Sequence, residues 1–81
     1  MTDLKQLLID IVRGIVSNPD AVCVTESVGE AATSLTLTVA PDDMGRVIGK
    51  NGRVANSIRV VMKAAAIARN VRINVEIRDA E

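Results

Sequence analysis

Apolar side chains follow a helical period at the start of the chain and an alternating period after it. Between residues 4 and 16 they recur every three or four positions, which predicts an amphipathic helix. The run Ser-Asn-Pro-Asp at 17–20 ends that helix, because proline cannot continue it and its neighbours favour turns. Residues 21–28 and 34–40 then alternate, which predicts two strands joined by a turn near Gly29.

Two further helices and a final strand are expected in the second half of the chain. Proline at 41 is followed by two aspartates, which suit the positive end of a helix dipole, so a short helix is expected over residues 42–48. Two glycines end it, and a longer helix is expected over about residues 53–69. Residues 71–78 alternate as a half-buried strand does. The predicted fold is α+β, in the order helix-strand-strand-helix-helix-strand, with a three-stranded sheet covered by helices on one face.

The long helix carries two apolar faces. The face expected to point at the sheet consists of Val54, Ile58, Val61, Ala65 and Ala68. Val60, Ala64 and Ile67, which we call the apolar stripe, lie roughly opposite, next to Lys63. Three apolar residues in a row suggest a partner surface, and the small Ala64 would let two helices approach closely. We predict a dimer interface at these four residues; the alternative is that the first helix covers the stripe.

Length and composition are those of a small globular protein. The 81 residues allow one hydrophobic core, so a single domain over residues 1–81 is expected. No run of about twenty apolar residues and no secretory signal is found, so no membrane partner and a cytoplasmic location are expected. The lone Cys23 fits a reducing compartment.

Charge is strongly polarised, although the formal net charge is zero. Residues 1–43 carry two basic side chains and seven acidic ones. Residues 44–75 carry no acid and seven basic side chains, namely Arg46, Lys50, Arg53, Arg59, Lys63, Arg69 and Arg72. A local basic surface attracts phosphate even when the whole chain is neutral.

The segment Gly49-Lys50-Asn51-Gly52 lies at the centre of this basic stretch. Glycine accepts positive φ and lets another backbone approach closely. The helix that follows directs its free N–H groups and positive dipole end toward the segment, so an anion is stabilised there. Arg46, Lys50 and Arg53 add cations. A tight turn between helices is the alternative, but the acid-free surroundings favour an anion site.

Other chemistries fit the sequence less well. A Walker loop would need glycine at Met44 and a hydroxyl residue at Asn51, and a dinucleotide fingerprint would need glycine at Val47. Histidine is absent, and Cys23, Ser34 and Ser57 lack a partner that would activate them. We therefore expect no enzyme, no catalytic residue, no metal and no cofactor.

Residues 47–53, Val-Ile-Gly-Lys-Asn-Gly-Arg, followed by Ile58, resemble the signature of the KH domain, whose Gly-x-x-Gly loop clamps about four nucleotides of backbone. The element order resembles the bacterial type II arrangement, and the whole chain is similar to small stand-alone bacterial KH proteins of the KhpA type. The resemblance implies binding of single-stranded RNA and an RNA-chaperone role. It also implies a homodimer or a heteromer with a larger KhpB-type partner, and control of cell length and peptidoglycan homeostasis.

The resemblance also implies a groove for the bases. Since the chain has no aromatic residue, the bases would rest on aliphatic side chains. Val47, Ile48, Val54 and Ile58 are candidates for its floor, and Asn56 and Arg59 for its rim; each apolar residue alone is more typical of the core. The predicted RNA-binding residues are Arg46, Val47, Ile48, Gly49, Lys50, Asn51, Gly52, Arg53, Asn56 and Arg59. The alternative function is a dimerisation or scaffold module that binds little RNA.

Overall fold

Three helices and three strands follow one another in the predicted order in the computed structural model, which describes residues 2–79. Short 3-10 turns precede β1, α2 and α3, at Pro19–Ala21, Pro41–Asp43 and Lys50–Gly52. The main elements are α1 (Thr2–Arg13), β1 (Cys23–Val28), β2 (Thr33–Val39), α2 (Met44–Ile48), α3 (Arg53–Ala68) and β3 (Ile73–Asp79).

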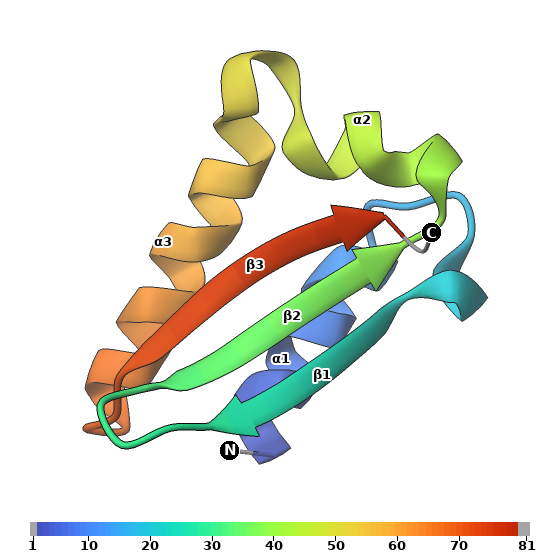
Figure 1. Ribbon diagram of the computed structural model, residues 1–81. Coiled ribbons are helices and arrows are strands. Elements are labelled where there is room, and N and C mark those ends of the chain that lie inside the picture. The colour runs from blue at the N-terminus through green and yellow to red at the C-terminus, as the bar shows by residue number, and fades with distance from the viewer. Residues whose placement is uncertain (1, 80–81) are drawn as a thin grey trace.

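The sheet is mixed, with β2 in the middle. β1 pairs antiparallel to β2 through a short turn, whereas β3 pairs parallel to β2. A parallel pair needs a long crossover, and α2, the glycine loop and α3 form it. Figure 1 shows α1 and α3 on the same side of the sheet, while the opposite face carries no helix. The predicted α+β fold, with helices on one face, is confirmed.

The core lies between this helical layer and the sheet. On β2, Leu35, Leu37 and Val39 are fully buried and alternate with half-buried polar residues, as the sequence predicted. From α1, Leu4, Leu8 and Val12 complete the layer. The helix ends at Arg13, earlier than predicted. After it the chain forms a tighter turn of the 3-10 type, in which Ile15 N–H donates to the carbonyl of Val12, three residues earlier, at 2.9 Å.

The buried face of α3 differs from the prediction. It consists of Ala55, Ile58, Met62 and Ala66. Val61 is 48% exposed and Ala68 is exposed, so both were wrongly placed against the sheet. The prediction centred the face on β-branched residues, whereas α3 packs on both α1 and β3. Small alanines on either side of Ile58 and Met62 let the helix lie close to the other elements.

The apolar stripe of α3 is open to solvent. Val60 is 63% and Ile67 77% exposed, and Ala64 between them is exposed as well. The first helix therefore does not cover the stripe, and that alternative is excluded. Val61 and Ala68 widen the exposed apolar surface on one side.

Candidate nucleic-acid interface

The loop of residues 49–52 turns the chain sharply between α2 and α3. Gly49 (φ 76°, ψ 173°), Asn51 (φ 57°) and Gly52 (φ 74°) all have positive φ. The turn is closed by Gly52 N–H, which donates to the Gly49 carbonyl at 3.2 Å. Only glycine adopts the Gly49 conformation readily, while asparagine is among the residues that tolerate the left-handed region found at position 51. The backbone of the loop thus depends on its residue types.

The two glycines have different surroundings. A Cβ added to Gly49 would lie 2.4 Å from Cγ2 of Val54, which is an impossible contact. A Cβ added to Gly52 would meet nothing within 4 Å. Gly49 therefore lets the loop pack against the first turn of α3, and Gly52 leaves the outer side of the loop open to a ligand.

Three exposed cations lie in the loop or near it in the chain. Lys50 and Arg53 are exposed, and within residues 2–79 neither forms an ion pair. Arg46 is exposed too, although its Nε lies 3.7 Å from Oδ1 of Asp43. Because the residue before α3 is Gly52, no side chain caps that helix, and its first N–H groups favour an anion. The predicted anion-binding elements are therefore close together and accessible.

Asp43 anchors the start of α2 to residues 17–18, in the loop that follows α1. Its carboxylate is 1% exposed and accepts hydrogen bonds from Ser17 N–H (2.9 Å) and from the backbone and side-chain nitrogens of Asn18 (3.0 and 3.1 Å). The Ser17 bond, followed by the Asn18 bonds and the charge of Arg46, holds the pKa of Asp43 below its usual value, although burial opposes this. Sequence reasoning took Asp43 for a helix-start charge and missed this anchor.

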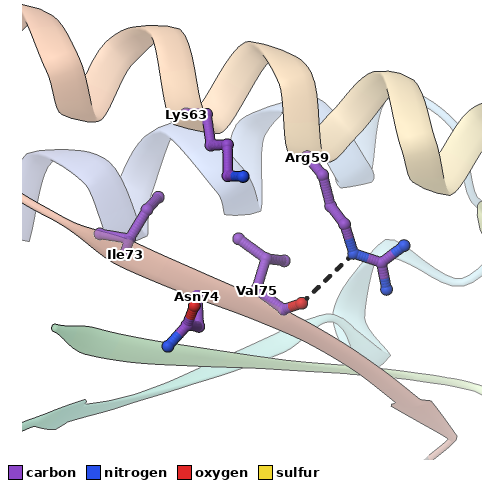
Figure 2. Close-up of a pocket in the computed structure, with 5 residues that line it drawn as sticks. All are labelled: Arg59, Lys63, Ile73, Asn74 and Val75. Carbon is purple, nitrogen blue, oxygen red and sulfur yellow. Dashed lines mark hydrogen bonds between the residues drawn. The ribbon is translucent and has the colours of Figure 1, made fainter.

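A groove lies between the middle of α3 and the first residues of β3. It contains a cavity of about 230 Å³ lined by Arg59, Lys63, Ile73, Asn74 and Val75 (Figure 2). Arg59 and Lys63 both extend from α3 toward β3, and Arg59 Nε donates to the Val75 carbonyl at 3.4 Å. Lys63, predicted at the dimer interface, thus lies on the groove side of the helix. The β3 residues were missed because sequence alone does not show which strand edge lies beside α3.

The predicted apolar floor is smaller than expected. Val47 is fully buried and Ile58 nearly so, and both belong to the hydrophobic core, so neither offers surface to a base. Ile48 and Val54 are half-buried beside the loop and remain available. Asn56 is exposed on α3, like the rim residue Arg59. For Val47 and Ile58 the core interpretation is correct, because apolar residues next to a loop also have to hold its helices in place.

A mixed three-stranded sheet backed by helices, with a Gly-x-x-Gly loop joining two helices beside a groove, defines a type II KH domain. The family model described as the KhpA/KhpB KH domain matches residues 5–77. The chain belongs to this family.

Curated relatives align with most of the chain. A protein of Clostridium acetobutylicum named RNA-binding protein KhpA is 54% identical over 74 residues, which cover 91% of this chain and 99% of the relative. The KhpA of Clostridium perfringens is 49% identical over the same shares of the two chains. The KhpA of Treponema pallidum is 43% identical over 75 residues, 93% of this chain and 94% of the relative. The similarity therefore extends over nearly the full length of these proteins.

Residues 2–79 contain neither a candidate metal site nor a candidate membrane helix. No group of three or more histidine, cysteine or acidic residues is placed to hold a metal ion there. No helix in this part of the chain has both the length and the apolar character to cross a membrane.

Proposed function

We propose that this chain is a non-enzymatic RNA-binding protein whose loop at residues 49–52 clamps the phosphate backbone of single-stranded RNA. The observation that carries the proposal is the geometry of the loop, in which Lys50 and Arg53, neither of them ion-paired within residues 2–79, flank the uncapped start of α3. The names of the relatives, which call them RNA-binding proteins, support the same conclusion. A phosphate at the loop receives backbone N–H groups and two mobile cations together.

The bases would lie along α3, between the loop and the groove lined by Arg59. Ile48 and Val54 offer half-buried aliphatic surface beside the phosphate site, and Arg59 stands farther along α3. Aliphatic contact gives less energy for each base than aromatic stacking, so phosphate contacts would supply most of the affinity. We infer modest affinity with a strong dependence on salt.

The variant Lys50→Asp/Asn51→Asp tests the clamp. It places two carboxylates where the phosphate would lie, so we expect RNA affinity to fall at least about tenfold and the dependence of log K on log salt to become shallower. Fluorescence anisotropy with labelled single-stranded RNA measures both quantities. Lys5→Glu reverses a charge in the first turn of α1, a helix whose start lies at the opposite end of the molecule from the loop (Figure 1), and serves as the control. Circular dichroism checks folding, since the chain has no Trp or Tyr.

Unchanged affinity in the folded loop variant would rule out the clamp. It would favour the alternative function, a dimerisation or scaffold module that binds little RNA. Equal losses in the loop variant and the Lys5 control would mean that only overall charge matters, which also contradicts a specific clamp.

We further propose that the apolar stripe pairs with a second copy of this chain. Val60, Ala64 and Ile67 form an exposed strip without charge, and Ala64 at its centre lets two helices approach closely. A dimer would place two clamps on one RNA, which raises the apparent affinity of a weak single site. A heteromer with a larger KhpB-type protein is a second possible use of this surface.

Val60→Asp is expected to convert a dimer into a folded monomer, because pairing would bury its carboxylate without a partner. Sedimentation velocity measures the state, and Lys5→Ala, with the same charge change outside the stripe, should remain dimeric. A monomeric wild type, or a variant that still sediments as a folded dimer, would show that the stripe is not the interface.

Finer aspects of the proposed function come from the family resemblance. They are an RNA-chaperone role in the cytoplasm, post-transcriptional regulation, and effects on cell length and peptidoglycan homeostasis. A weak clamp with little sequence readout suits a chaperone, since such a protein has to release its RNA readily.

A further inference from the structure

We propose a second nucleotide subsite at the far end of the α3 groove, a deepening that rests on the proposed RNA-binding function. A cavity of about 460 Å³ lies where the last turns of α3 meet the start of β3 and the turn between β1 and β2. It shares Lys63, Ile73 and Asn74 with the smaller cavity beside Arg59. The two cavities therefore adjoin, and their combined lining extends from Arg59, in the middle of α3, to Arg72.

Backbone hydrogen bonds hold the walls of this cavity in place. On one side, Gly29 N–H donates to the Ala32 carbonyl at 3.0 Å and closes the β1–β2 turn. Thr33 N–H donates to the Arg72 carbonyl at 3.0 Å and ties that turn to the segment before β3. The cavity thus exists before any ligand binds, as ligand sites usually do.

The end of α3 forms the remaining wall. Val71 N–H donates to the Ala66 carbonyl and Asn70 N–H to the Ile67 carbonyl, both at 3.0 Å, and Asn70 is left-handed (φ 60°). This is the Schellman termination of a helix. It fixes the direction in which the chain leaves α3 and so the position of Arg72.

The chemistry of the lining suits a nucleotide. Ile67, Ala31 and Ala32 supply apolar surface, and Ile67 is largely uncovered. Lys63 and Arg72 supply two exposed cations, and within the described part of the chain neither is ion-paired. No acidic residue lines either cavity. An arginine guanidinium stacks on a base or binds a phosphate, and in a chain without aromatic residues Arg72 is suited to both roles.

An RNA strand fits this surface better than a protein segment does. A peptide would need only the apolar part of the cavity, whereas the pair of unopposed cations continues the basic lining of Arg59 farther along the groove. RNA held by the loop at one end of α3 would pass Arg59, meet Lys63 next and reach Arg72 last. We therefore assign the cavity to a nucleotide beyond those held at the loop.

Labelled oligo(U) of four and of eight nucleotides, measured by fluorescence anisotropy, tests the subsite. Arg72→Ala should weaken binding of the eight-nucleotide RNA about three- to tenfold and leave the four-nucleotide RNA within about twofold of wild type. The ratio of variant to wild type is compared at each length, because a longer RNA offers more binding registers to both proteins. Lys5→Ala, which removes a charge outside the groove, should change neither ratio.

A second variant and a monomeric background keep the test independent of folding and of dimerisation. Ala31→Glu adds a carboxylate at an exposed lining position and should reproduce the length-dependent loss. The Arg72 effect should persist when Val60→Asp is present, because two clamps on one RNA cannot then explain it. Equal losses of affinity for the four- and eight-nucleotide RNAs, or no loss in either variant, would overturn the subsite. The cavity would then be better explained as a binding site for a protein partner. The clamp at the loop fails separately, if the Lys50→Asp/Asn51→Asp variant binds RNA as wild type does.

Discussion

Replacing Gly49 with alanine is expected to destabilise the protein by about 3 kcal/mol. This loss is the sum of two costs, the strain of a backbone conformation that alanine rarely adopts and the steric overlap of the added carbon with its neighbour. At φ 76° and ψ 173° any residue with a Cβ is strained, and the added carbon would lie 2.4 Å from Cγ2 of Val54. The strain falls at the joint between α2 and α3, so either the loop or the start of α3 has to move. For a domain of this size the melting temperature should fall by roughly 12 to 24 °C.

Gly52→Ala is the matched control for this prediction. Gly52 also has positive φ, but an added Cβ would enter open space. The left-handed conformation then costs alanine only about 1 kcal/mol net, because alanine also lowers the entropy of the unfolded chain, which offsets part of the strain. Thermal melts followed by far-UV circular dichroism should therefore rank wild type above Gly52→Ala and Gly52→Ala above Gly49→Ala. Equal stabilities would contradict the geometry of the loop. Because the displaced loop would no longer present Lys50 beside α3, RNA binding should weaken most in Gly49→Ala.

Local pattern was enough to predict most of the fold. Strand β2 was predicted correctly because Leu35, Leu37 and Val39 alternate with polar residues without interruption. An alternation of this kind is typical of a strand with one buried face. The loop was predicted well for a related reason. Glycine spacing is a local property, and the conformations of Gly49 and Gly52 are ones that few other residues adopt.

The errors arose where the answer depended on packing between distant segments. The buried face of α3 was displaced because Val61 and Met62 are both apolar, and only the positions of α1 and β3 decide which of them turns inward. Val47 and Ile58 were placed in a groove for the same reason, since a helix next to a ligand site and a helix next to the core have similar patterns. The Arg59–Val75 contact needs β3 beside α3, which local periodicity does not specify.

Helix α3 divides its surface among three tasks. Ala55, Ile58, Met62 and Ala66 face the core, and Arg59 and Lys63 face the groove. The apolar stripe is exposed to solvent, and its last residue, Ile67, also lines the larger cavity. Lys63 lies between the groove and the stripe. A partner bound on the stripe would therefore lie next to the groove, and dimerisation would affect how RNA leaves the loop. This arrangement links the two proposed activities through one helix.

Asp43→Asn is expected to lower stability markedly at neutral pH, even though the substitution keeps the shape of the side chain. Asp43 accepts three hydrogen bonds from Ser17 and Asn18, and an amide group has only one oxygen with which to accept them. At least one donor of these partly buried hydrogen bonds would be left facing an NH₂ group, which is costly. Asp42→Asn removes the same charge from an exposed neighbour and should have little effect. Comparable losses in the two variants would mean that helix-end charge, and not the anchor, is important.

The pH dependence distinguishes the anchor further. The pKa of Asp43 is lowered in the folded protein, chiefly by the hydrogen bond from Ser17, so the unfolded chain binds a proton at higher pH than the folded one does. The stabilisation is therefore complete above the unfolded value of about 3.9 and is lost as the pH falls through the folded value. Asp3, whose pKa the Arg69 hydrogen bond lowers, contributes a loss of the same sign in both proteins. In urea titrations followed by circular dichroism at pH 7, 4 and 3, the gap between wild type and Asp43→Asn should narrow with acidification. A gap that stays constant would show that the carboxylate charge plays no part in holding α2, and with it the loop, in place.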